Sequence, residues 1–171
     1  MKALLELTYR RENPQNSAMS TDPREQALQA AYQLVSEHFP NVAMVAEAQF
    51  VNEEGQPQFA QMMRWYGCST TATGLMVFAA DLLCRTFGDR PPKPNPVPAA
   101  VVHPAQEEAL QRALAILGEH FACALVVVQG EPELTSKSER SLKAVRCSGP
   151  PTMVAGLAQF AANALRRMAV E

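Results

Sequence analysis

The sequence GLMVFAADLL, at residues 74–83, recurs as GLAQFAANAL at residues 156–165. The two segments share a glycine, two leucines, a phenylalanine and two alanines at the same places, and they begin 82 residues apart. The same spacing relates the segment EHF at residues 37–39 to EHF at residues 119–121. A fixed spacing that recurs in separated segments is typical of an internal duplication. The sequence therefore predicts two copies of one structural unit.

Each copy is expected to run helix, strand, strand, helix. Asp22 and Pro23 are typical of a helix start, and Glu25, three residues after Asp22, completes the pattern of a capping box. The apolar run at residues 42–46 and the segment 59–68 predict the two strands of the first copy. The corresponding strands of the second copy are expected at residues 124–128 and 140–147.

A single two-stranded hairpin cannot cover its own apolar face, so the two copies are expected to fold together. We therefore predict an α+β fold in which internally duplicated αββα units form a pseudo-two-fold, four-stranded antiparallel sheet with packed helices. Phe78 and Phe160 occupy matching places in the repeat and are expected to be buried in equivalent environments. Trp65, the single tryptophan, is expected in the core.

The repeat also divides the chain. Residues 1–21 lie outside it and are predicted to form an N-terminal arm, with the first αββα repeat at residues 22–88. Residues 89–102 form a linker rich in proline, a composition that favours a stiff, extended spacer. The second αββα repeat is predicted at residues 103–171.

Composition excludes several classes of protein. Of 171 residues 19% are charged, and the formal charge of -2 gives no reason to expect a nucleic-acid or membrane partner. The basic residues between 137 and 146 alternate between the two faces of the expected strand and so form no continuous stripe. The four cysteines show no metal-ligand spacing and no export signal precedes them, so we predict reduced thiols and a cytoplasmic protein.

The junction between the second strand and the second helix is the strongest candidate for a ligand site. It reads GCSTTATG at residues 67–74 and RCSGPPT at residues 146–152. Small hydroxylated residues before a helix leave backbone N–H groups that bind anions, although the same residues also serve as ordinary helix caps. The candidate ligand-binding residues are Ser69, Thr70, Thr71 and Thr73 in the first copy, and Arg146, Ser148 and Thr152 in the second.

A thiol site is the other candidate. If the second hairpin is three residues shorter than the first, Cys68 and Cys147 occupy equivalent places before a helix, where the pKa of a thiol is often lowered. His38 and His120 end the two first helices and could pair with these cysteines. The alternative is that the cysteines are small buried residues and that the histidines favour the negative end of a helix.

These observations rank three functions. The first is a non-catalytic binding protein that acts through protein contacts as a homodimer, because no catalytic acid pair, cofactor fingerprint or metal motif is found and no cofactor is expected. The second is a small-molecule binder that holds a phosphate-like or nucleotide-like anion at the junctions, and the third is a thiol enzyme. The homodimer is predicted because the helix at residues 74–87 is apolar almost all round and needs cover on two sides.

Overall fold

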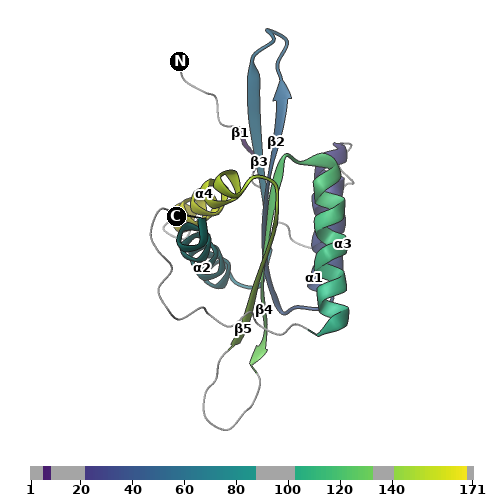
Figure 1. Ribbon diagram of the computed structural model, residues 1–171, viewed down its shortest axis with the longest axis vertical. Coiled ribbons are helices and arrows are strands. Elements are labelled where there is room, and N and C mark those ends of the chain that lie inside the picture. The colour runs from purple at the N-terminus through teal and green to yellow at the C-terminus, as the bar shows by residue number, and fades with distance from the viewer. Residues whose placement is uncertain (1–5, 9–21, 88–102, 133–140, 169–171) are drawn as a thin grey trace.

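In a computed structural model of the protein, the described residues are 6–8, 22–87, 103–132 and 141–168 (Figure 1). The predicted order of helix, strand, strand and helix is confirmed for both segments of the chain. The helices are α1 (Pro23–Ser36), α2 (Ser69–Phe87), α3 (Pro104–His120) and α4 (Pro151–Met168). The strands are β1 (Glu6–Thr8), β2 (Asn41–Val51), β3 (Pro57–Tyr66), β4 (Cys123–Pro132) and β5 (Ser141–Ser148).

The strands form one sheet in the order β1-β3-β2-β4-β5. β3, β2, β4 and β5 pair antiparallel with one another, which confirms the predicted α+β fold with a four-stranded antiparallel sheet. The pairing of β2 with β4 joins the two segments at the centre of the sheet. β1 was not part of the predicted sheet, and it pairs with β3 in parallel at the outer edge.

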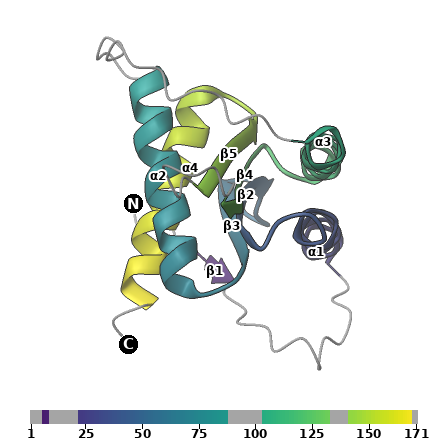
Figure 2. The same cartoon turned by 90° about the horizontal axis from the view of Figure 1, so that it is seen from below.

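The helices cover both faces of the sheet. α1 and α3 pack side by side on one face, while α2 and α4 pack side by side on the other (Figures 1 and 2). Along β2, Val42, Met44 and Ala46 belong to the core under α1 and α3, whereas Ala43 and Val45 belong to the core under α2 and α4. Because both faces are covered, β2 reads as a continuous apolar run instead of an alternating one.

The starts of α1 and α3 follow from local sequence. The side chain of Asp22 accepts a hydrogen bond from the backbone N–H of Arg24 at 2.9 Å, so the predicted cap is confirmed. Glu25, predicted to close a capping box, lies 3.6 Å from Arg64 of β3 in an ion pair. At α3 the capping box forms between His103 and Gln106.

The strand register keeps the 82-residue spacing in the part of each hairpin nearest the junction, and a register shift between Gln129 and Pro132 ends it in the second hairpin. Met44 pairs with Arg64 in the first hairpin, and Val126 pairs with Arg146 in the second. Each hairpin is followed by a glycine with positive φ, 94° at Gly67 and 100° at Gly149, a conformation that other residues rarely adopt. The return strand of the second hairpin is therefore not shifted by three residues, because both junctions have the same length.

This register corrects the predicted equivalence of two cysteines. Cys147 pairs with Leu125 within β5, as Trp65 pairs with Ala43 within β3. Cys68 lies beyond the end of β3, immediately before α2. The prediction that Cys68 and Cys147 occupy equivalent places is therefore wrong. Trp65 is half-buried and packs against the core under α2 and α4.

Two predictions about the second helices are also corrected. Phe78 and Phe160 are both half-buried, not buried. α2 does have an exposed face, which includes Gly74, Asp81 and Arg85, and its apolar side is covered by the sheet and by α4 (Figure 2). The shape of α2 therefore gives no reason for a second subunit. The side chain of Phe87 lies outside the described residues, as do residues 1–5 and 9–21 of the predicted arm (1–21) and the predicted linker at 89–102.

Candidate functional site

Cys68 sits at the N-terminus of α2, where its carbonyl accepts the N–H of Ala72 at 3.1 Å. Its Sγ atom lies 3.0 Å from the hydroxyl oxygen of Thr71 and accepts the backbone N–H of Thr71 at 3.4 Å. The contact with the Thr71 hydroxyl, followed by that with the Thr71 N–H, lowers the pKa of the exposed thiol below its ordinary value. The N-terminus of α2 therefore stabilises a negative charge on its own capping residue.

The hydroxyl groups predicted to bind an anion lie inside α2, because this helix begins at Ser69. The hydroxyl of Thr73 donates to the carbonyl of Ser69 at 2.8 Å, and that of Thr71 contacts the sulfur of Cys68. Ser69 and Thr70 are exposed. Two of the four candidate hydroxyls are thus engaged within the first turn of the helix, and the sulfur occupies the place beside the Thr71 N–H.

The second junction has different chemistry. Pro150 takes the place of Cys68, since the N–H of Val154 donates to its carbonyl at 3.1 Å, and Pro151 begins α4. Proline has no N–H to offer an anion. Ser148 is half-buried at the end of β5, paired with Ala124, while Thr152 is exposed on the first turn of α4. The junctions are alike in length and backbone conformation but not in the donors they present.

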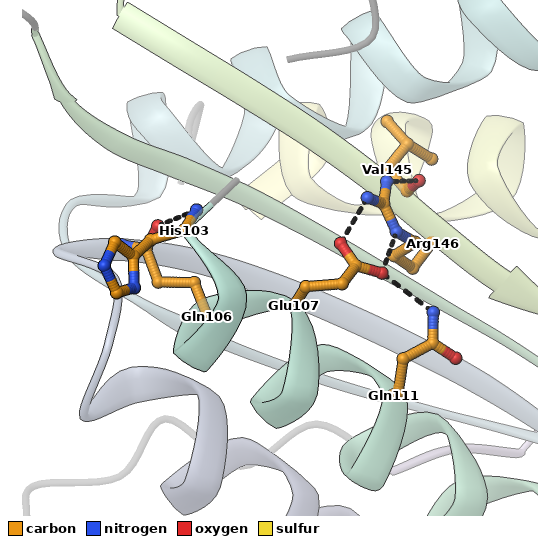
Figure 3. A network of polar contacts seen from close by, with 6 residues as sticks. All are labelled: His103, Gln106, Glu107, Gln111, Val145 and Arg146. Carbon is orange, nitrogen blue, oxygen red and sulfur yellow. Dashed lines mark hydrogen bonds and ion pairs between the residues drawn. The ribbon is translucent and has the colours of Figure 1, made fainter. Parts of the chain in front are cut away.

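Arg146, the basic candidate for the second junction, is bound elsewhere (Figure 3). Its Nε and Nη2 atoms donate to the two carboxylate oxygens of Glu107 on α3 at 3.0 and 2.5 Å. Gln111 donates to the same carboxylate at 2.8 Å. The hydrogen bonds from Arg146 and Gln111 lower the pKa of Glu107 below its ordinary value. Arg146 therefore ties β5 to α3, on the sheet face opposite to α4.

The predicted thiol–histidine pairs are not brought together by any hydrogen bond among the described residues. His38, just after α1, and His120, the last residue of α3, are both exposed. Burial raises the pKa of Cys147, although part of this residue reaches the surface, and raises the pKa of the buried Cys123 to about 11. Among Cys68, Cys123 and Cys147, Cys68 is thus the one whose surroundings favour a thiolate.

The described part of the chain offers neither a cluster of metal ligands nor a membrane-spanning helix. Its histidine, cysteine, aspartate and glutamate residues form no group of three or more that could hold a metal ion. None of its helices is long and apolar enough to cross a membrane.

A surface that the sequence reading missed lies on the β2–β3 hairpin. β2 pairs with β4 only over residues 41–47, so residues 48–51 continue with β3 alone and the hairpin extends beyond both helix layers (Figure 1). Val51 and Phe59 are 67% and 42% exposed. Val51 pairs with Pro57, which stands two residues before Phe59, so all three side chains lie on one face. We call Val51, Pro57 and Phe59 the hairpin patch.

The signal for this surface was present in the sequence. Phe50 and Val51 precede the polar turn at residues 52–56, and Phe59 follows it. The apolar run that predicts the first strand covers residues 42–46, and the polar Glu47 follows it. Glu47 is accommodated by the amide of Gln61, which donates to it at 2.6 Å across the strand pair.

Comparison of the chain with protein families, with curated proteins and with solved structures found no match.

Proposed function

We propose that this chain is a non-catalytic protein-interaction domain and that the hairpin patch is its contact surface. The observation that carries the proposal is the exposure of Val51 and Phe59 on a hairpin that extends past the rest of the sheet. Exposed aromatic and aliphatic side chains that gather on one face are typical of protein interfaces. The partner we propose is a second copy of the chain, because an apolar patch on a hairpin can pack against itself across a two-fold axis.

Sedimentation of the full chain tests this proposal. Phe59→Asp places a charge in the hairpin patch, and we expect the dissociation constant of the dimer to rise at least about tenfold, because burial of a phenylalanine contributes roughly 1.5–3 kcal/mol. Gln56→Asp is the matched control, with an acidic side chain in the turn of the same hairpin. A wild-type chain that stays monomeric at high concentration would exclude the homodimer. An unchanged dissociation constant in Phe59→Asp would exclude the patch.

We infer that the two segments of the chain derive from a duplication and are related by an approximate two-fold axis. Three observations support this inference. Leu28 and Leu110 are buried at matching places, the junctions share a glycine with positive φ, and the ion pair of Arg64 with Glu25 has its counterpart in Arg146 with Glu107. In every case the matching residues stand 82 positions apart. We also propose a cytoplasmic location, which is supported by the four free cysteines.

A thiol function at Cys68 is the second candidate, and the contacts with Thr71 favour it. Anion binding at the junctions has less support, because Thr71 and Thr73 already bond within α2 and because prolines occupy the second junction. Calorimetric titration with inorganic phosphate separates the two candidates. Heat of binding that is lost in Thr70→Ala would favour an anion site, whereas no heat would leave the thiol as the chemical group at this junction.

A further inference from the structure

The two outer strands of the antiparallel sheet, β3 and β5, are built alike. Each carries an arginine that pairs with a glutamate on the helix beneath it, Arg64 with Glu25 on α1 and Arg146 with Glu107 on α3. With the register that these pairs share, Gln61 and Met62 of β3 correspond to Lys143 and Ala144 of β5. Ala60 corresponds by sequence spacing to Leu142, which lies at the register shift of the second hairpin. The strand that pairs with the outer edge of β3 therefore indicates the kind of strand that the outer edge of β5 can accept.

The outer edge of β3 is occupied. β1 lies along it in parallel, with Glu6, Leu7 and Thr8 opposite Ala60, Gln61 and Met62. No strand among the described residues lies on the outer side of β5, which ends the sheet (Figure 2). Because a strand edge presents unpaired N–H and C=O groups, it is a template for a further strand.

The charge on the β5 edge indicates the kind of strand that fits. Lys143 corresponds to Gln61, and its ammonium nitrogen lies 5.2 Å from the centre of the Phe78 ring on α2. No carboxylate among the described residues pairs with Lys143. In the first hairpin, the residue opposite Gln61 is Glu47 on β2, and the Gln61 amide donates a hydrogen bond to its carboxylate. In the second hairpin, the residue opposite Lys143 in the same row is the neutral Gln129 on β4. Among the described residues no carboxylate meets this row, and a strand added on the open side of β5 would bring one to it.

We propose that the outer edge of β5 accepts an extended segment of a partner protein, added in parallel over residues 142–144 with an acidic side chain opposite Lys143. Main-chain hydrogen bonds hold the added strand, as β1 is held on β3. The carboxylate selects the segment, because residues directly opposite in a sheet project to the same face and attract when their charges are opposite. This inference does not depend on the hairpin patch, which lies on the other hairpin.

A peptide with the sequence of residues 3–9, ALLELTY, is the probe, because it contains β1. Three labelled forms are titrated against the full chain: the natural peptide, one with Leu7→Glu, and one with Thr8→Glu. We expect Leu7→Glu to bind about two- to five-fold more tightly than the other two, the range for a cross-strand charge pair. Thr8→Glu carries the same charge on the opposite face of the strand and is the control. Equal affinity of the two acidic peptides would overturn the proposed register.

A variant of the protein tests the lysine. Lys143→Gln reproduces the residue found at the corresponding place on β3, and we expect it to abolish the preference for the Leu7→Glu peptide while the natural peptide still binds. A preference that survives Lys143→Gln would overturn the role of Lys143.

Amide hydrogen exchange locates the bound peptide. We expect the Leu7→Glu peptide to slow exchange at residues 142–144 of the wild-type chain. Slowed exchange at residues 60–62 would mean that the peptide has replaced β1 on β3, and this result would overturn the proposal. The absence of binding by all three peptides would overturn it as well.

Peptides with an N-methyl group test the main-chain hydrogen bonds. An N-methyl group at residue 7 of the peptide removes one main-chain donor, and one at residue 8 removes the next. Because neighbouring N–H groups point to opposite sides of a strand, we expect only one of the two to weaken binding. Equal effects would argue against strand addition.

Discussion

Met44 on β2 pairs with Val126 on β4, and the two residues stand 82 positions apart in the sequence. One position away on either side, Ala43 pairs with Val127 and Val45 pairs with Leu125. Leu125 stands 82 positions after Ala43, and Val127 stands 82 positions after Val45, so a shift of 82 residues turns each of these pairs into the other. An antiparallel pair coincides with itself after a two-fold rotation only when its register has this property. The central pairing is therefore the one that a two-fold relation between the halves requires.

If the halves are equivalent, matching core substitutions should have matching effects. Leu28→Ala on α1 and Leu110→Ala on α3 each remove a side chain that is 1% or less exposed. We expect each to lower the free energy of unfolding by about 2–5 kcal/mol, because the cavity left behind adds to the lost burial. Denaturant unfolding measures the loss of stability in each variant. A difference between the two losses that is larger than the width of this expected range would argue that the two environments are not alike.

The ion pair of Glu107 with Arg146 predicts a dependence on pH. Because hydrogen bonds from Arg146 lower the pKa of Glu107 in the folded chain, the stabilisation is present above the ordinary pKa of 4.5 and is lost as pH falls through the folded pKa. We expect Glu107→Gln to cost about 0.5–1 kcal/mol at neutral pH, since the pair is partly exposed. Urea unfolding at several pH values should show this difference shrinking in acid.

Glu108→Gln is the control for that measurement, because Glu108 is the exposed neighbour on the same helix. We expect its stability to stay within about 0.5 kcal/mol of wild type at every pH. A Glu107→Gln curve that runs parallel to wild type down to acidic pH would show that the carboxylate does not titrate as its contacts imply.

The glycine at the second junction should not tolerate a side chain. A Cβ atom at Gly149 would lie 2.6 Å from the Cβ of Cys123 and 2.8 Å from the carbonyl oxygen of Ala122, and its φ of 100° is itself unfavourable for alanine. We expect Gly149→Ala to cost at least about 1–3 kcal/mol by thermal or urea unfolding. Gly67→Ala should cost less, because the nearest atom there belongs to the side chain of Asn41, which can move.

Gly74→Ala is the matched control for the glycine series. Gly74 lies within α2, and nothing stands within 4 Å of the position of an added Cβ. We expect this variant to gain about 0.5–1 kcal/mol, because alanine favours the helix. A loss of stability at Gly74 similar to that at Gly149 would show that steric contact at the junction is not the cause.

Cys68 should react with alkylating reagents faster than Cys147 or Cys123. The contacts with Thr71 lower the pKa of Cys68, whereas burial raises the pKa of Cys147 and raises that of Cys123 to about 11. Mass spectrometry after brief treatment with iodoacetamide at a series of pH values measures each rate. Thr71→Val should slow the alkylation of Cys68, because it removes the hydroxyl contact with the sulfur. Thr70→Val serves as the control. A Cys68 rate that is unchanged in Thr71→Val would mean that the hydroxyl does not stabilise the thiolate.

Local chemistry was enough to predict the order of the elements from α1 to α4, although not β1. Asp22 and Pro23 begin a helix by satisfying or removing backbone N–H groups within a few residues. The apolar runs at residues 42–46 and 124–128 predicted the two central strands, although β2 extends further, to Val51. The repeated spacing of 82 residues also relates Leu28 to Leu110 and Ala72 to Val154, all of which are buried. These features depend on neighbours along the chain, and so the sequence by itself determined them.

Only the tertiary structure decided which partners the polar candidates have. Arg146 reads in sequence as part of a junction, but its side chain points to the other face of the sheet and meets Glu107, 39 residues earlier. The exposure of Phe59 follows from where β4 stops pairing with β2. β1 lies beside β3, whereas no described strand lies on the outer side of β5. A strand's register fixes the face of every side chain, and it is set by contacts between distant segments, which no local pattern contains.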